Sequence, residues 1–134
     1  VREEKGYTYG IYSMLVPMVN EGYFLIASEV GAGVCREAIS TIYDEIIKLR
    51  NEKVGKEELN MVKNYMKGQL LRAFDGPIPT AATYLSLIEL SLKEDHYQRV
   101  IETINQIGPG EIQDLAIKYL NEEEMIQSIA GKCE

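Results

Sequence analysis

Side-chain types alternate along residues 7–16, the first regular pattern in the chain. Tyrosine, β-branched and other apolar residues recur at every second position, which predicts a strand with two distinct faces. Pro17 cannot donate a hydrogen bond to a strand ladder, so the strand should end there. A turn at residues 20–22 and a second apolar run at residues 23–30 then predict an antiparallel neighbour.

Helical spacing of apolar residues replaces this alternation after a glycine-containing break at residues 31–33. Residues 35–50 and 56–73 each carry an apolar stripe at three- and four-residue intervals, which predicts two helices joined as an αα-hairpin. The stripe expected to be buried on the second helix consists of Leu59, Val62, Tyr65, Met66, Gln69 or Leu70, and Ala73.

Glycine and proline divide the rest of the chain into three further helices. The break at residues 75–79 contains one glycine and two prolines, which a helix interior does not accommodate. We expect a third helix over residues 81–92, with Thr80 as its cap. A fourth should run from about Asp95 to the break at residues 108–110, and a fifth over residues 111–120.

A short apolar run at residues 125–130 predicts a third strand. Two antiparallel strands, five helices and a final strand indicate an α+β fold, with a small antiparallel sheet covered by helices. A strand that arrives so late needs a central partner, and the first residues resemble a helix end without a preceding N-cap signal. We therefore expect residues 1–134 to be a single partial domain, truncated at its N-terminus. Its uncovered apolar surface should favour self-association into a homo-oligomer.

Composition excludes some classes of function. Apolar residues make up 46% of the 134 residues, enough for a real core. The net charge is −7 and the acidic residues are spread along the chain, so no basic stripe is available for a nucleic acid partner. No apolar run reaches the roughly 18 residues of a membrane span. Localisation stays open, because any signal peptide would lie upstream of a fragment.

The sequence predicts neither a metal site nor a catalytic residue in this chain. His96 is the only histidine, and the HxxEH and HExxH zinc motifs each need two. The acidic residues just before His96 fit a solvated helix start better than a ligand cluster. The Gly-Ala-Gly break at residues 31–33 lacks the spacing of a phosphate-binding loop and is interpreted as a plain turn.

Cys35 and Cys133 lie far apart in the sequence and form no CxxC motif. Two cysteines cannot complete a tetrahedral thiolate site. A disulfide between them is one alternative, but two separate thiols are the simpler expectation. Cys35 begins a helix, whose dipole can activate a thiol, yet nothing in the sequence places His96 beside it as a base.

Arg2 and Tyr9 are the candidate substrate-binding residues, on opposite sides of Gly6. If Gly6 ends a helix and the chain returns as a strand, both side chains can point at one spot. Guanidinium donors and a phenolic hydroxyl suit the carbonyl oxygen or developing oxyanion of a peptide. An ordinary surface arginine and a cross-strand tyrosine fit the same residues equally well.

The opening stretch resembles a family signature. Residues 2–13 (REEKGYTYGIYS) are similar to the second-domain pattern LRE-x-x-G-x-x-Y-x-x-x-S of the M16 (pitrilysin/insulinase) metallopeptidases, which include the mitochondrial processing peptidases. Further similarities follow in order at residues 21–24, at 54–59 with Lys63, and at 107–120 and 129–132. Valine precedes Arg2 where leucine is usual. The resemblance covers nearly the whole chain and points to the later part of the domain that lacks zinc.

The resemblance also implies a function. M16 peptidases pair a zinc-bearing domain with a similar domain that lacks the zinc motif, and the two close around an unfolded peptide. It implies that Arg2 and Tyr9 grip the peptide near the scissile carbonyl. Zinc would sit in an HxxEH-bearing partner domain, in the same or another chain, so this chain alone would be inactive although its parent is a zinc metallopeptidase. The alternatives are a non-catalytic scaffold or binding subunit of the same fold, and an unrelated α+β interaction module.

Overall fold

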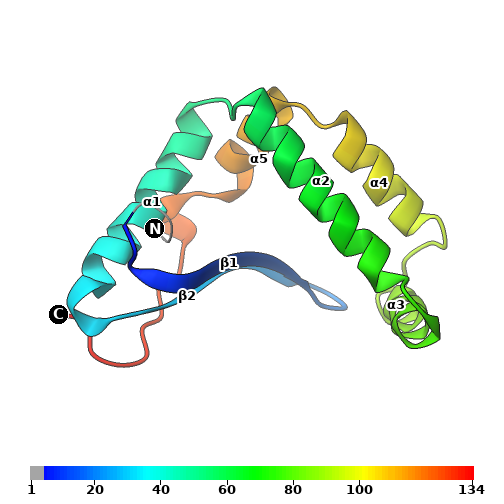
Figure 1. Cartoon of the computed structure of the whole chain (residues 1–134), viewed down its shortest axis with the longest axis horizontal. Coiled ribbons are helices and arrows are strands. Elements are labelled where there is room, and N and C mark those ends of the chain that lie inside the picture. Colours follow the sequence, from blue (N-terminus) through cyan, green and yellow to red (C-terminus); the bar gives the residue numbers. More distant parts are fainter. Residues whose placement is uncertain (1–4) are drawn as a thin grey trace. The chain divides into compact units, whose positions relative to one another are not determined.

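A computed structural model describes residues 5–134 (Figure 1). The described elements are two strands and five α-helices, which confirms the α+β class. In chain order they are β1 (Thr8–Pro17), β2 (Gly22–Val30), α1 (Cys35–Asn51), α2 (Lys56–Ala73), α3 (Pro77–Glu89), α4 (His96–Gln106) and α5 (Pro109–Tyr119), with the short 3-10 turns η1 (Ala32–Val34) and η2 (Glu122–Glu124). No helix within the described residues is long and apolar enough to cross a membrane.

The chain divides into two compact units. The first is formed by the start of the chain up to Val16 together with Gly22–Lys53 and Gln113–Glu134. The second consists of Pro17–Glu21 and Val54–Ile112. Most of the β-hairpin, α1 and most of α5 therefore belong to the first unit, and α2, α3 and α4 to the second.

Helix α1 supplies most of the buried residues of the first unit. Its predicted stripe is confirmed, since Ala38 and Ile46 are buried, and Cys35 and Thr41 are buried with them. The hydroxyl of Thr41 donates to the carbonyl oxygen of Glu37 at 2.7 Å, which satisfies a buried polar group within the helix. From α5, Ala116 is also buried.

The two cysteines form a disulfide, so the expectation of two separate thiols was wrong. Their Cα atoms lie 5.2 Å apart, within the range that a disulfide requires. The physical reason is that the last residues of the chain lie beside the start of α1, where the backbone N–H of Glu134 donates to the carbonyl oxygen of Ala32 at 3.1 Å. Cys35 therefore carries no free thiol.

The third strand expected at residues 125–130 is not formed. Within residues 5–134 the sheet consists of β1 and β2 alone, so this segment has no strand beside which it pairs. It follows η2 as irregular chain, and Ile126 is 97% exposed, unlike a residue of a half-buried strand. The segment is attached at one end by the disulfide and near the other by Arg50 and Glu122, whose charged groups lie 4.0 Å apart.

The second unit is built on α2, against which α3 and α4 pack. Lys63 of α2 donates to the backbone carbonyl of Asn105 at 3.0 Å, and the buried hydroxyl of Thr83 in α3 donates to Ala73 at 3.0 Å. The predicted stripe of α2 is buried only at Leu59. Its members Val62, Tyr65 and Met66 are exposed, so that part of the prediction was wrong, because the neighbouring helices leave this face of α2 open.

Helix α3 begins at Pro77, four residues before the expected start. A break is present, but it covers residues 74–76 rather than 75–79, and it includes Gly76, whose φ of 97° favours glycine. Pro77 follows at the first helical position, where its missing N–H leaves no bond unmade. Thr80 is therefore not a cap, and its hydroxyl donates to the carbonyl oxygen of Gly76 at 2.8 Å. Helix α5 likewise begins at a proline, Pro109, rather than at residue 111.

Candidate functional site

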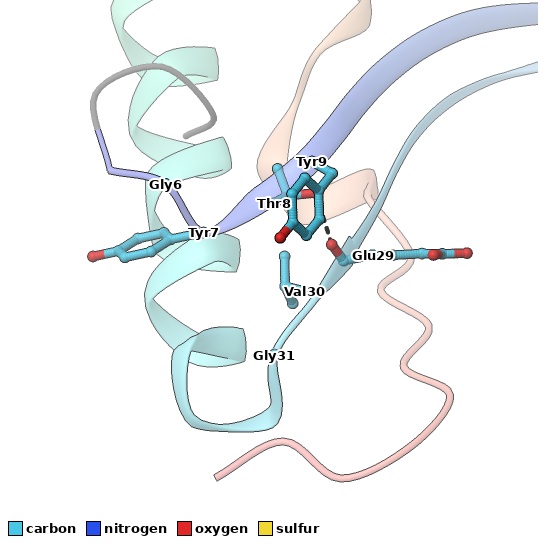
Figure 2. A pocket seen from close by; sticks show the side chains of 7 residues that line it. All are labelled: Gly6, Tyr7, Thr8, Tyr9, Glu29, Val30 and Gly31. Atoms are coloured by element: carbon cyan, nitrogen blue, oxygen red, sulfur yellow. Dashed lines mark hydrogen bonds between the residues drawn. The ribbon is translucent and has the colours of Figure 1, made fainter.

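An open depression of about 630 Å³ lies where β1 begins and β2 ends (Figure 2). Both strands contribute backbone and side chains to it, and all of it belongs to the first unit. Its lining residues are Gly6, Tyr7, Thr8, Tyr9, Glu29, Val30 and Gly31. The depression therefore includes one of the two predicted substrate-binding residues.

Tyr9 lines the depression with a side chain that is 99% exposed. Among residues 5–134 no hydrogen bond engages its hydroxyl, so the phenolic O–H is available to a ligand. The other predicted residue, Arg2, lies outside the described residues. The pairing of Arg2 with Tyr9 therefore stays a prediction.

Thr8 is a buried polar residue next to Tyr9, and it was not among the residues predicted for the site. Its hydroxyl donates to the carbonyl oxygen of Glu29 at 2.7 Å, the bond drawn in Figure 2. The carbonyl oxygen of Gly10 lies 2.8 Å from the same hydroxyl. The hydroxyl oxygen of Thr8 accepts a hydrogen bond from the backbone N–H of Gly10 at 3.1 Å. Thr8 thus attaches the first residues of β1 to the last residues of β2. A threonine in a strand carries no sequence signal for such a role.

Ser28 provides a second hydroxyl bond across the strands. Its Oγ donates to the carbonyl oxygen of Gly10 at 3.0 Å, at an exposed position. Both peptide groups of Gly10 are therefore engaged, its N–H by Thr8 and its carbonyl by Ser28. These contacts hold the backbone directly after Tyr9.

Lys5 attaches the segment before β1 to helix α1, because its ammonium donates to Thr41 Oγ1 at 3.3 Å. The same ammonium lies 5.8 Å from the centroid of the Tyr7 ring. Hydrogen bonding to the Glu37 carboxylate raises the pKa of Tyr7, and desolvation and the negative charge of Glu37 add to the effect. Tyr7 also lines the depression, and in Figure 2 its ring points away from Tyr9.

Gly6 makes the bend between this attachment and β1. Its φ is 63°, in the left-handed region that side chains with a Cβ disfavour. The helix expected before Gly6 falls on residues 1–4, outside the described residues, so the predicted chain reversal stays a prediction. No atom lies within 4 Å of the position that a Cβ would take, so the requirement for glycine is conformational.

The residues described here do not fit a zinc ion. Within residues 5–134 no group of three or more His, Cys, Asp or Glu side chains is placed to hold a metal. The cysteine sulfurs are bonded to each other, and His96 stacks edge-on against Tyr97 with ring centroids 5.2 Å apart. The neighbouring carboxylate of Asp95 pairs with Arg99 at 3.1 Å.

The fold and part of the sequence are similar to known proteins. No family model matches the chain. The chain is 23% identical over 130 residues to the "Uncharacterized zinc protease YmxG" of Bacillus subtilis (strain 168), an alignment that covers 97% of this chain and 32% of that protein. Its structure is similar to the crystal structure of a peptidase M16 inactive domain from Pseudomonas fluorescens, with a TM-score of 0.77 and 20% identity over 90% of this chain. The resemblance to M16 peptidases is confirmed.

The M16-like chain spans only part of these relatives. It covers 32% of the length of the Bacillus protein and 29% of the Pseudomonas chain. At 20% identity the structural match shows that the chain has the fold of that domain.

Proposed function

We propose that this M16-like chain is the substrate-gripping, non-catalytic part of a zinc-dependent peptidase that degrades or processes peptides in a chamber between two domains. The similarity to a zinc protease and to an inactive M16 domain supports the class of reaction. The zinc ion and the HxxEH motif that binds it would belong to a partner domain, in the same or another chain. The role of the present chain is to bind the peptide.

The exposure of Tyr9 at the depression is the observation that carries the proposal. The backbone on both sides of Tyr9 is held by hydrogen bonds. A phenolic O–H donates one hydrogen bond from a rigid ring, which suits a peptide carbonyl oxygen. When a partner domain closes over the site and excludes water, such a donor stabilises negative charge that develops on that oxygen. Arg2 would add a charged donor to the same peptide.

The test replaces Tyr9 by phenylalanine in the intact protein, with its zinc-bearing partner present. A donor that acts on the developing oxyanion should contribute roughly 100- to 1000-fold to kcat, so Tyr9→Phe should lower kcat by that factor with little change in KM. Arg2→Ala should weaken both turnover and peptide binding. The matched control is Tyr12→Phe, which removes the hydroxyl of another exposed tyrosine on the opposite face of β1.

Two results would count against the proposal. Unchanged turnover and peptide affinity in both Tyr9→Phe and Arg2→Ala would remove these residues from the site. An intact protein that has no partner HxxEH motif and cleaves no peptide would favour the alternative, a scaffold or binding subunit of the same fold.

A further inference from the structure

We infer that Thr8 is a positioning residue for Tyr9, because its buried hydroxyl fixes the backbone that aims the tyrosine hydroxyl at a peptide. The inference rests on the proposed role of Tyr9 in peptide binding. It adds a residue that neither the family signature nor the exposed surface identifies.

The exposure of Tyr9 shows why a positioning residue is needed. With 99% of its side chain exposed, the ring has almost no packing neighbours to hold its direction. The direction of the Cα–Cβ bond is then set by the backbone alone. Any rotation of the peptide units on either side of Tyr9 therefore displaces its hydroxyl, which lies at the far end of the ring.

The hydroxyl oxygen of Thr8 links the residues on either side of Tyr9. It accepts a hydrogen bond from the backbone N–H of Gly10 at 3.1 Å. The same hydroxyl donates to the carbonyl oxygen of Glu29 in β2 at 2.7 Å. Since Thr8 is 8% exposed, water competes little for these bonds. The bond from Gly10 to Thr8 therefore spans the backbone of Tyr9, and the bond from Thr8 to Glu29 attaches it to β2.

Gly10 makes this bond necessary. Glycine has the greatest backbone freedom of any residue, and no atom lies within 4 Å of where a Cβ on Gly10 would be. Besides the pairing of β1 with β2, the side chains that restrain Gly10 are Thr8 and Ser28. The bond from Ser28 to the Gly10 carbonyl is exposed to water.

A double-mutant cycle in the intact protein tests the inference. Thr8→Val keeps the shape of the side chain and removes its hydroxyl. It should lower kcat/KM for a peptide substrate roughly three- to tenfold, the worth of a typical hydrogen bond. In a Tyr9→Phe background Thr8→Val should cause almost no further loss, because the hydroxyl that it positions is already absent. Thr8→Ser, which restores the hydroxyl, should return kcat/KM to within about twofold of the wild type.

A second substitution separates positioning from a general loss of stability. Gly10→Ala restricts the freed backbone, and the open space around Gly10 accommodates the methyl group. Compared with Thr8→Val alone, the Thr8→Val/Gly10→Ala protein should therefore recover part of the lost kcat/KM. Because alanine restricts the unfolded chain, this double variant should also fold more readily than Thr8→Val alone. Thermal unfolding of every variant accompanies the kinetics.

The outcomes are distinguishable. If Tyr9→Phe lowers turnover but Thr8→Val lowers it equally in both backgrounds, Thr8 acts independently of Tyr9 and the inference is wrong while the proposed function stands. An undiminished kcat/KM in Thr8→Val also overturns the inference. If Tyr9→Phe behaves as wild type, the proposed function itself fails, and the positioning role fails with it.

Discussion

Cys35 and Cys133 are joined by a disulfide across 98 residues of sequence, with Cα atoms 5.2 Å apart. The bond connects the first turn of α1 to the irregular segment that follows η2. Because that segment has no strand partner within residues 5–134, the disulfide is the main attachment of its end.

Breaking the disulfide should therefore lower stability. Closing a loop of this length restricts the unfolded chain, and the chain-entropy model gives about 4–5 kcal/mol for it. Cys133→Ser should lower the free energy of unfolding in chemical denaturation by an amount of that order. A thiol reductant should destabilise the wild type to a similar extent and leave Cys133→Ser unaffected. A reductant that shifts neither protein would show that the bond contributes nothing to stability.

The pKa of Tyr7 should depend on Glu37. The hydrogen bond exists only with the neutral phenol, so the pKa of Tyr7 is raised in the folded state, and Glu37→Gln should lower it toward its ordinary value. The stabilisation is fully present below the ordinary tyrosine pKa of about 10 and is lost as the pH rises through the higher folded value. NMR of ring-labelled tyrosine, assigned with Tyr7→Phe, measures this pKa. An identical titration in Glu37→Gln would contradict the hydrogen bond.

Gly76→Ala should destabilise the second unit. Gly76 has a φ of 97°, and the nearest atom to an added Cβ is 4.0 Å away, so the penalty comes from the backbone rather than from a clash. With a ψ of 168° Gly76 lies in a region that almost only glycine adopts, so forcing an alanine into it should cost about 1–3 kcal/mol. Gly55→Ala is the matched control, because Gly55 also precedes a helix but has a φ of −63°. Equal unfolding midpoints for the two variants would be evidence against backbone strain at Gly76.

Ile46 and Ile47 offer a paired test of the core of α1. Ile46 is 5% exposed and its neighbour Ile47 is 38% exposed. Ile46→Ala should lower the free energy of unfolding by about 2–5 kcal/mol, through lost burial and the cavity left behind. Ile47→Ala should cost much less, because part of its side chain already contacts water. The burial pattern of α1 would be refuted if Ile47→Ala proved the more damaging change in denaturation.

Local patterns in the sequence predicted the helices well. The bounds of α2 were predicted to the residue, because Gly55 and the acidic first turn mark its start and its good helix formers continue to Ala73. The start of α3 was missed for a local reason as well, since Pro77 and Pro79 fit the first turn of a helix and do not prevent it.

Non-local contacts could not be predicted in the same way. The apolar run at residues 125–130 has the composition of a strand, but pairing depends on an edge that the run itself does not specify. The disulfide depends on where the chain end returns, which the spacing of Cys35 and Cys133 leaves open. In the candidate site, side-chain chemistry and the resemblance in residues 2–13 selected Tyr9, whose role stays a prediction. The contribution of Thr8 depends on its position opposite Glu29, which follows only from the register of β1 and β2.

The division of the chain into two units sets an order of folding during synthesis. Nearly all of the second unit is one continuous stretch, Val54–Ile112, whereas the first unit needs residues up to Glu134. During synthesis α2, α3 and α4 can therefore assemble while the hairpin and α1 still lack the segment Gln113–Glu134. Because the depression beside Tyr9 belongs to the unit that is completed later, its surroundings would be fully assembled only once residues 113–134 have been made.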